Sequence, residues 1–579
     1  MRTPMTGRDD YLLDIRNLLV RFRGAETPAI NGLDLQMRAG ETLALVGESG
    51  CGKSTTALSI MGILPASAEV SGEVRLEGEN TLGVTPKRLR QLRGAAMSMI
   101  FQEPMTALNP VHRIGDQIVE ILRCHLPLSR RQARARALEL IELVRLPDPK
   151  RIIDEYPHRL SGGQRQRVMI AMAIACRPRL LIADEPTTAL DATIQAQILE
   201  LLDELRRKLG MGLLLITHDL TLVSRWTDRV VVMHHGEKLE TLPTAELYRP
   251  GRHPYTSGLI KASIRLDEDV HYTRSTLAEI KVSREEDGAY RYAVSEPRPQ
   301  FRPVKAVKPT LPLLAVNGLS VDYETHAGRR RALDNASLTL SPGETLGIVG
   351  ESGSGKSTLS KAIMRLVPAA TGSIMFDGQD ISRLNGDRLR PVRRKVQMVF
   401  QDPYGSLNPR ESVRDILEGA LIVHGVIDPA ERQRQIASTL DHVGLPLNAI
   451  HRFPHEFSGG QRQRIGIARA LVLQPSLVIC DEPVSALDVS IQAQVLNLLV
   501  ELKASLGLSY LFISHDLGVV RYISDRVIVM KDARIVEESD HATIWRNPAT
   551  DYTRRLIAAA SGGRPEDAAA PASLLQPTE

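Results

Sequence analysis

Two glycine-rich stretches of the chain carry the residue types that bind phosphate groups. Residues 47–54 (GESGCGKS) and 350–357 (GESGSGKS) both fit the pattern G-x-x-x-x-G-K-[ST]. Glycine lets backbone N–H groups approach phosphate oxygens without a Cβ in the way. The lysine can reach the outer phosphates, and the serine hydroxyl is a ligand for Mg²⁺. Two such loops predict that the chain binds ATP, or a close relative of ATP, twice.

The residues expected to bind nucleotide are Gly47, Ser49, Gly50, Gly52, Lys53, Ser54 and Thr55 in the first loop and Gly350, Ser352, Gly353, Gly355, Lys356, Ser357 and Thr358 in the second.

A pair of acidic residues ends an apolar run in each half of the chain. These pairs are Asp184-Glu185 and Asp481-Glu482. The aspartate can hold Mg²⁺ directly or through water, and the glutamate can polarise an attacking water molecule. Adjacent acids also occur simply as the solvated end of a strand. Their position downstream of a phosphate-binding loop favours the Mg²⁺ interpretation, with Ser54 and Ser357 as further ligands.

The flanking runs predict the elements that position these loops. Apolar, β-type residues precede each loop at 42–46 and 345–349, and helix-compatible residues follow at 55–61 and 358–364. Strands and helices go on alternating along each half, which is typical of an α/β fold with a mostly parallel sheet. Nucleotides bind at the carboxyl ends of such strands.

The two halves repeat each other with few net insertions. The loop lysines are 356 − 53 = 303 residues apart, Asp184 and Asp481 are 481 − 184 = 297 apart, and His218 and His515 are 515 − 218 = 297 apart. Offsets that differ by so few residues indicate a duplicated domain and not two unrelated nucleotide sites.

Composition sets the class of protein. The chain has 579 residues, 43% of them hydrophobic and 24% charged, with a net charge of +5 and four scattered cysteines. This length predicts several domains, and the small net charge gives no reason to expect nucleic acid binding. No signal peptide and no apolar run of membrane-spanning length is evident. The expectation is a soluble, cytoplasmic protein that reaches a membrane only through partners.

Four segments are predicted from the change in pattern along the chain. They are a first nucleotide-binding domain at 1–260, a Pro-rich linker at 261–312, a second such domain at 313–560 and a disordered tail at 561–579. The linker assignment rests on fading periodicity and on prolines such as Pro297, Pro303 and Pro309, which favour an extended, semi-stiff tether.

The motifs of both halves resemble those of ATP-binding cassette ATPases. Residues 160–164 (LSGGQ) and 457–461 (FSGGQ) are similar to the signature motif of that family. The resemblance covers nearly all of both halves and implies two tandem P-loop domains. Each would have a parallel core sheet, a small antiparallel β part and a helical subdomain. It also implies that two cassettes meet head to tail, so that the Lys53 loop is completed by Ser458 and the Lys356 loop by Ser161.

The resemblance implies roles for individual residues. The bases are Glu185 and Glu482, and the γ-phosphate sensors are His218 and His515. Gln102 and Gln401 match the Q-loop and join Ser54, Asp184, Ser357 and Asp481 at Mg²⁺. The signature residues are Ser161, Gly162, Gly163 and Gln164 in the first half and Ser458, Gly459, Gly460 and Gln461 in the second. Phe22 and Tyr323 match the aromatic residue that stacks on adenine, and the alternative for either ring is a place in a strand core.

Finer features resemble the ATPases of dipeptide and oligopeptide importers. These features are residues 101–110 (FQEPMTALNP), 400–409 (FQDPYGSLNP) and 253–256 (HPYT). Such ATPases are usually separate subunits; here they look fused, as in the glutathione-importer and Yej-type peptide-importer forms. The resemblance implies two transmembrane permease subunits and an external solute-binding protein as partners, at the cytoplasmic face of the inner membrane. No cysteine lies between Cys176 and Cys480, so no iron–sulfur cluster is expected.

Two alternatives belong to other classes of protein. A ribosome-associated translation factor would also have tandem cassettes and no membrane segment. Proteins of that class are expected to carry a long, charged pair of helices between the cassettes, where this chain has a Pro-rich segment. A DNA-repair cassette protein would carry zinc-ligand cysteines or a coiled-coil insertion. The importer remains the main hypothesis, with peptides as the expected cargo and with glutathione, antibiotic peptides and nickel chelates left open.

Overall fold

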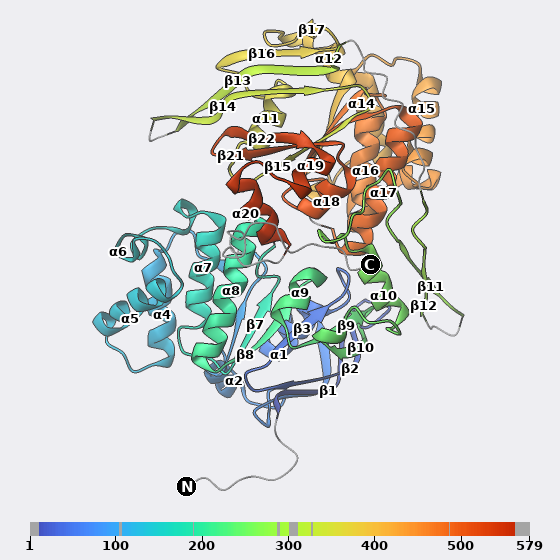
Figure 1. The fold of residues 1–579 in the computed structure, drawn as a ribbon. Helices are drawn as coiled ribbons and strands as arrows, with labels where there is room; N and C mark the ends of the chain where they lie inside the picture. Colours follow the sequence, from blue (N-terminus) through green and yellow to red (C-terminus); the bar gives the residue numbers. More distant parts are fainter. Residues whose placement is uncertain are drawn as a thin grey trace, which may run out of the picture. The chain divides into compact units, whose positions relative to one another are not determined.

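The computed structural model describes residues 11–103, 107–188, 190–286, 290–299, 311–325, 328–485 and 487–561. The chain forms two compact units (Figure 1). Along the sequence, the main boundary between them lies between Ile260 and Lys261.

A six-stranded sheet forms the centre of the first unit. Its strand order is β10-β9-β3-β8-β7-β6, parallel except for the antiparallel edge strand β10. The strands are β3 (Thr42–Val46), β6 (Met97–Ile100), β7 (Leu180–Asp184), β8 (Gly212–Ile216), β9 (Arg229–His234) and β10 (Glu237–Pro243). Every residue of β3, β7 and β8 is buried, as expected where helices cover both faces of a parallel sheet.

A second sheet and a group of helices complete this unit. The antiparallel sheet has the order β2-β1-β4-β5, formed by β1 (Tyr11–Phe22), β2 (Ile30–Arg38), β4 (Ala68–Leu76) and β5 (Glu79–Asn80). In the helical part, α4 (Ile114–His125) and α5 (Arg130–Leu143) lie side by side (Figure 1). The α/β class, with a small antiparallel part and a helical subdomain, is confirmed.

The second unit repeats this architecture. Its sheets have the orders β18-β19-β20-β15-β21-β22 and β14-β13-β16-β17. The strands are β13 (Leu314–Thr325), β14 (Gly328–Leu340), β15 (Thr345–Val349), β16 (Thr371–Phe376), β17 (Gln379–Asp380), β18 (Val396–Val399), β19 (Leu477–Asp481), β20 (Ser509–Ile513), β21 (Arg526–Lys531) and β22 (Arg534–Asp540). Its helical part contains α14 (Val413–Val423) and α15 (Pro429–His442). Throughout the described ranges, no helix is at once long enough and apolar enough to cross a membrane.

The segment expected to be a tether departs from an extended linker over residues 264–286 and 290–299, which we call the strap. The strap contains a two-stranded antiparallel sheet of β11 (Ile280–Arg284) and β12 (Tyr290–Val294). Its Tyr272 and Leu277 are buried in the same core as α17 (Val489–Leu506) of the second unit. Such isolated apolar residues have no periodicity, so their packing partners become evident only in the folded domain. Residues 300–310 lie outside the described part.

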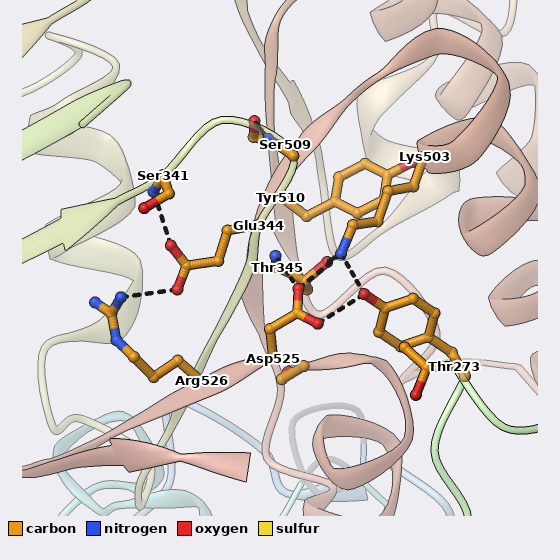
Figure 2. A network of polar contacts seen from close by, with 12 residues as sticks. Thr273, Ser341, Glu344, Thr345, Lys503, Ser509, Tyr510, Asp525 and Arg526 are labelled. Atoms are coloured by element: carbon orange, nitrogen blue, oxygen red, sulfur yellow. Dashed lines mark hydrogen bonds and ion pairs between the residues drawn. The ribbon is translucent and has the colours of Figure 1, made fainter. Parts of the chain in front are cut away.

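Polar contacts reinforce the packing of the strap (Figure 2). Lys503 Nζ on α17 donates to Tyr272 OH at 2.7 Å, to Thr345 Oγ1 at 2.8 Å and to Asp525 Oδ2 at 2.8 Å. Tyr272 OH in turn donates to Asp525 Oδ1 at 2.7 Å. Asn497 pairs with the backbone of Leu277, donating to its carbonyl and accepting from its N–H at 3.0 Å each. These hydrogen bonds make the strap part of the second unit.

Candidate active site

The glycine-rich loops join the central strand of each parallel sheet to the helix that follows. In the first unit the loop runs from β3 to α1 (Lys53–Met61), and in the second from β15 to α11 (Lys356–Ile363). Gly47 has φ +152°, and a Cβ there would lie 2.2 Å from the carbonyl oxygen of Met233. Gly350 repeats this with φ +150° and 2.2 Å to Met530. Only glycine lets the loop pass so close to the neighbouring strand.

The loop lysines lie at the first residue of their helices and are buried. Lys53 Nζ donates to the carbonyl oxygens of Gly47 at 2.8 Å and Glu48 at 2.9 Å. Lys356 Nζ makes the same contacts at 2.7 and 2.9 Å, with Gly350 and Glu351. Burial lowers the pKa of Lys356, while nearby carboxylates oppose that shift. Each ammonium is therefore held inside its own loop, next to the helix N-terminus where an anion binds favourably.

The serine that follows each lysine meets the first carboxylate of the acidic pair. Ser54 Oγ donates to Asp184 Oδ1 at 3.2 Å, and Ser357 Oγ donates to Asp481 Oδ1 at 3.2 Å. Burial raises the pKa of Asp184 to about 6, although the bond from Ser54 opposes the shift. The pKa of Asp481 is also raised, again chiefly by burial. This desolvation disfavours the bare carboxylates, and a bound cation would favour their charged forms.

The second carboxylate is the centre of a cluster in the first unit. Glu185 Oε2 accepts from Gln102 Nε2 at 2.9 Å and from Thr188 Oγ1 at 2.9 Å, and Glu185 Oε1 lies 3.3 Å from His218 Nδ1. Burial by itself would raise the pKa of Glu185, but its contacts with His218 and Thr188 and the charge of Lys53 bring it down to about 2. The carboxylate is thus ionised, and three neighbouring side chains fix its orientation.

The same cluster recurs in the second unit with one difference. Glu482 Oε2 accepts from Gln401 Nε2 at 2.8 Å and lies 3.0 Å from His515 Nδ1. Ser485 Oγ, at the position of Thr188, donates to the backbone carbonyl of Glu482 at 3.1 Å. Although burial opposes it, the contact with His515 lowers the pKa of Glu482, and the pKa of His515 is correspondingly raised.

Each signature motif starts a helix. Ser161 caps α7 (Gly162–Ala173): its Oγ accepts from Gln164 N at 3.3 Å, and its own N–H donates to Gln164 Oε1 at 3.0 Å. Ser458 caps α16 (Gly459–Leu471) in the same way, with 3.4 and 3.1 Å to Gln461. This reciprocal capping box leaves the first helical N–H groups directed toward the helix end.

A glycine inside each signature helix is required for close packing. At Gly163 a Cβ would lie 2.8 Å from Ile194 Cγ2, and at Gly460 it would lie 2.4 Å from Ile491 Cγ2. These contacts bring the signature helices α7 and α16 against α8 (Ala192–Leu209) and α17 of their own units. The second glycine of each SGGQ motif therefore has a structural reason that the spacing alone does not reveal.

The remaining predicted residues lie outside the two carboxylate clusters. Ser49, Gly50, Ser352 and Gly353 are exposed at the loop tips. Phe22 ends β1 and is half-buried against the core of the first unit, whereas Tyr323 on β13 is 37% exposed. Their stacking on adenine stays a prediction, as does the pairing of each loop with the signature of the other unit.

The sequence analysis did not predict the hydroxyl side chains that lie beside Glu185 and Glu482. Thr188 and Ser485 each lie three residues after the glutamate, in EPTT and EPVS. The shared spacing of a hydroxyl residue in the two halves was a usable signal. The backbone conformation of the two glutamates could not be predicted from the sequence. Glu185 has φ +47° and Glu482 has φ +50°, in the left-handed region that non-glycine residues rarely adopt.

Two family models match parts of this chain. Residues 30–188 and 333–485 both match the model of the family described as ABC transporter. Residues 239–289 match that of the oligopeptide/dipeptide transporter C-terminal region. Part of the chain, 39%, is 30% identical to a dimeric ATP-binding cassette bound to ADP and Pi, with a TM-score of 0.37 and 98% of that chain covered.

Curated relatives match almost the whole chain. The glutathione import ATP-binding protein GsiA of Pectobacterium atrosepticum is 44% identical over 96% of this chain and 91% of its own length. The ABC transporter ATP-binding protein YejF of Escherichia coli is 45% identical over 94% of this chain and 99% of its own length. These matches agree with the duplicated loops, carboxylate clusters and signature helices. This chain therefore belongs to the ABC transporter family and is a nucleotide-binding ATPase with two cassettes.

Proposed function

We propose that this chain hydrolyses ATP at two composite sites and thereby drives the import of peptides or glutathione-like solutes. Each site would combine the loop of one cassette with the signature helix of the other, Lys53 with Ser458 and Lys356 with Ser161. Supporting this arrangement, both cassettes carry a complete set of site residues. A capped helix start such as that at Ser161 or Ser458 also offers N–H groups to an anion.

The single observation that carries the proposal is the carboxylate cluster at Glu185, repeated at Glu482. We assign both glutamates as the groups that orient and deprotonate the attacking water. A bond from His218 keeps Glu185 weakly basic. If His218 turns toward the γ-phosphate of ATP, Glu185 loses that bond and becomes a stronger base. His218 and His515 would thus couple the presence of the γ-phosphate to the basicity of the glutamate.

The residues around Ser54 and Asp184 fit a magnesium ion. Mg²⁺ takes oxygen ligands and is usually bound by one or two protein groups together with substrate phosphates. Ser54 Oγ and Asp184 Oδ1 lie 3.2 Å apart, as do Ser357 Oγ and Asp481 Oδ1. Gln102 and Gln401 donate through Nε2, which leaves their carbonyl oxygens as ligands. These residues would hold the ion, whose positive charge would offset the negative charge of the outer phosphates.

The transported solute is proposed from the relatives. GsiA is by its name a glutathione import protein, and residues 239–289 match an oligopeptide/dipeptide transporter region. We therefore assign two membrane permease subunits and an external solute-binding protein as partners, with this chain peripheral at the cytoplasmic face of the inner membrane. Nothing in the comparisons supports the ribosome-associated alternative.

Reconstitution would test this function. The chain should co-purify with two permease subunits, and its ATPase rate in vesicles should rise when binding protein loaded with a dipeptide or with glutathione is added. The unloaded binding protein is the control. Sedimentation with ribosomes in place of the permease subunits would overturn the importer assignment. Stimulation by only one of the two solutes would identify the cargo.

A further inference from the structure

A tyrosine from the C-terminal part of each cassette contacts the glycine-rich loop. Glu48 N–H donates to Tyr255 OH at 3.2 Å, and Glu351 N–H donates to Tyr552 OH at 3.3 Å. The tyrosines are 552 − 255 = 297 residues apart, the same offset as the acidic pairs. The contact is thus present twice, once in each cassette.

This contact fixes one end of a peptide unit whose other end is also held. The Glu48 N–H shares its planar peptide group with the Gly47 carbonyl, which accepts from Lys53 Nζ at 2.8 Å. In the second cassette the Gly350 carbonyl accepts from Lys356 Nζ at 2.7 Å. The tyrosine and the lysine therefore hydrogen-bond to the N–H and the carbonyl of the same peptide group at the start of the loop.

The tyrosines are themselves anchored. Tyr255 lies in the first turn of α10 (Pro254–Ala262) and is fully buried, with its ring centroid 4.5 Å from that of His234. A carboxylate on the edge strand holds the residue before the helix, because His253 N–H donates to Glu240 Oε2 at 3.2 Å.

The second cassette has the matching anchors. Tyr552 lies in α20 (Asp551–Ala560), with Lys531 Nζ 5.0 Å from the centre of its ring. The N–H of Thr550, equivalent to His253, donates to Glu537 Oε2 at 3.0 Å. In each cassette, a glutamate of the edge strand therefore holds the start of the helix that carries the tyrosine.

We propose that Tyr255 and Tyr552 are positioning residues of the two nucleotide sites, each setting the orientation of the first peptide of its glycine-rich loop. A loop rich in glycine loses much conformational freedom on ordering. A hydrogen bond that orders it beforehand lowers the cost of binding phosphate. The tyrosines do not reach the reacting atoms through these contacts, so the effect belongs to nucleotide affinity. This role rests on the proposed function of the loops.

Tyr255→Phe, Tyr552→Phe and the double variant test the proposal in the full-length chain, since each removes only the hydroxyl. The double variant should raise KM for ATP and Kd for a fluorescent ADP analogue by about 2- to 10-fold, as expected for the loss of one neutral hydrogen bond per site. Its kcat should stay within about 2-fold of wild type. Amide exchange of residues 47–53 should quicken in Tyr255→Phe and not in Tyr552→Phe.

Tyr510→Phe is the matched control. Tyr510 is a buried tyrosine whose hydroxyl donates to the Leu499 carbonyl at 2.9 Å, within the core of the second cassette. It should alter stability without changing KM. Unchanged affinity and loop exchange in the double variant would overturn the positioning role, as would an equal loss in Tyr510→Phe. A wild-type chain that fails to bind the ADP analogue would instead contradict the proposed function itself.

Discussion

At the scale of single residues, the glutamate of each cassette combines strain with precise orientation. Glu185 and Glu482 have positive φ values of 47° and 50°, a conformation that costs a non-glycine residue energy and is typical of functional sites. The backbone N–H of Glu185 is held by the Ile216 carbonyl at 2.9 Å, and that of Glu482 by Ile513 at 2.9 Å. These bonds from the neighbouring strand maintain the strained turn that aims the carboxylate at its partners.

Replacing these carboxylates should separate binding from hydrolysis. In the double variant Glu185→Gln and Glu482→Gln, ATP should still bind, while turnover should fall by about 100-fold or more because the general base is lost. Equilibrium binding and steady-state hydrolysis would measure the two effects. The single variants, which leave one base intact, are the controls. Loss of nucleotide binding would contradict the assigned role.

At the scale of elements, the strap distinguishes the second cassette from the first. With the offset of 297, Lys503 and Asn497 correspond to Arg206 and Glu200 of the first cassette. Arg206 bonds to the nearby Asp203 at 3.1 Å and to the Gly40 carbonyl. The cassettes therefore share one fold, but the second has exchanged side chains on α17 that accept a segment from outside the repeat.

Removing the central ammonium should loosen the strap. Lys503→Met leaves Asp525 and Tyr272 without their shared partner. Because Asp525 is only half-buried, losing this ion pair should cost about 1–3 kcal/mol, between the values for exposed and fully buried pairs. Amide exchange in residues 271–277 and in α17 should quicken. Arg206→Met in the first cassette is the matched control and should leave strap exchange unchanged. Equal exchange in Lys503→Met and wild type would show that the network does not hold the strap.

Strap docking should also weaken in mild acid. The rings of His271 and of His541 on α19 (His541–Arg546) lie 4.2 Å apart. Burial lowers the pKa of His271, and the charges of Lys503 and Arg274 add to that shift. Burial also lowers the pKa of His541, to about 4, and there the His271 imidazole and Arg521 add to the shift. The charged groups facing this pair are Asp269, Arg274, Lys503, Arg521, Asp525 and Arg546.

The sign of this effect follows from linkage. A histidine whose folded pKa lies below its unfolded value of about 6.5 contributes stability above that pH, and the contribution is lost as the pH falls toward the folded pKa. Unfolding free energy of the strap should therefore drop between pH 7 and pH 5, by at most about 1.4 kcal/mol per pH unit for each histidine. His541→Thr, which installs the residue found at Thr244 of the first cassette, should flatten the profile. An unchanged slope would contradict this interpretation.

At the scale of the whole molecule, the composite-site proposal can be tested by pairing substitutions. If Lys53 shares a site with Ser458, Lys53→Ala combined with Ser458→Arg damages one site and leaves the other able to bind. Lys53→Ala combined with Ser161→Arg damages both. Nucleotide bound per chain, measured in the Glu185→Gln and Glu482→Gln background, should be about one and about zero respectively. The opposite pattern would show that each cassette completes its own site.

Much of the fold and of the chemistry could be predicted from the sequence. The glycine-rich loops, the acidic pairs and the buried strands of the core sheet are local patterns, and their duplication at nearly the same offset identifies two copies of one domain. The physical reason is that phosphate-binding loops and fully buried strands constrain residue type position by position. The α/β class and the family followed from those residues alone.

Only the tertiary structure decided which of these residues act together. Gln102 and Glu185 are 83 residues apart, and Glu48 and Tyr255 are 207 apart, yet each pair shares a hydrogen bond. The sheet order β10-β9-β3-β8-β7-β6 differs from the order along the chain, so strand ends that are neighbours in space carry no mark of it in sequence. The packing of the strap was likewise not evident from the sequence, because Tyr272 and Leu277 are isolated apolar residues that join the core of the second cassette.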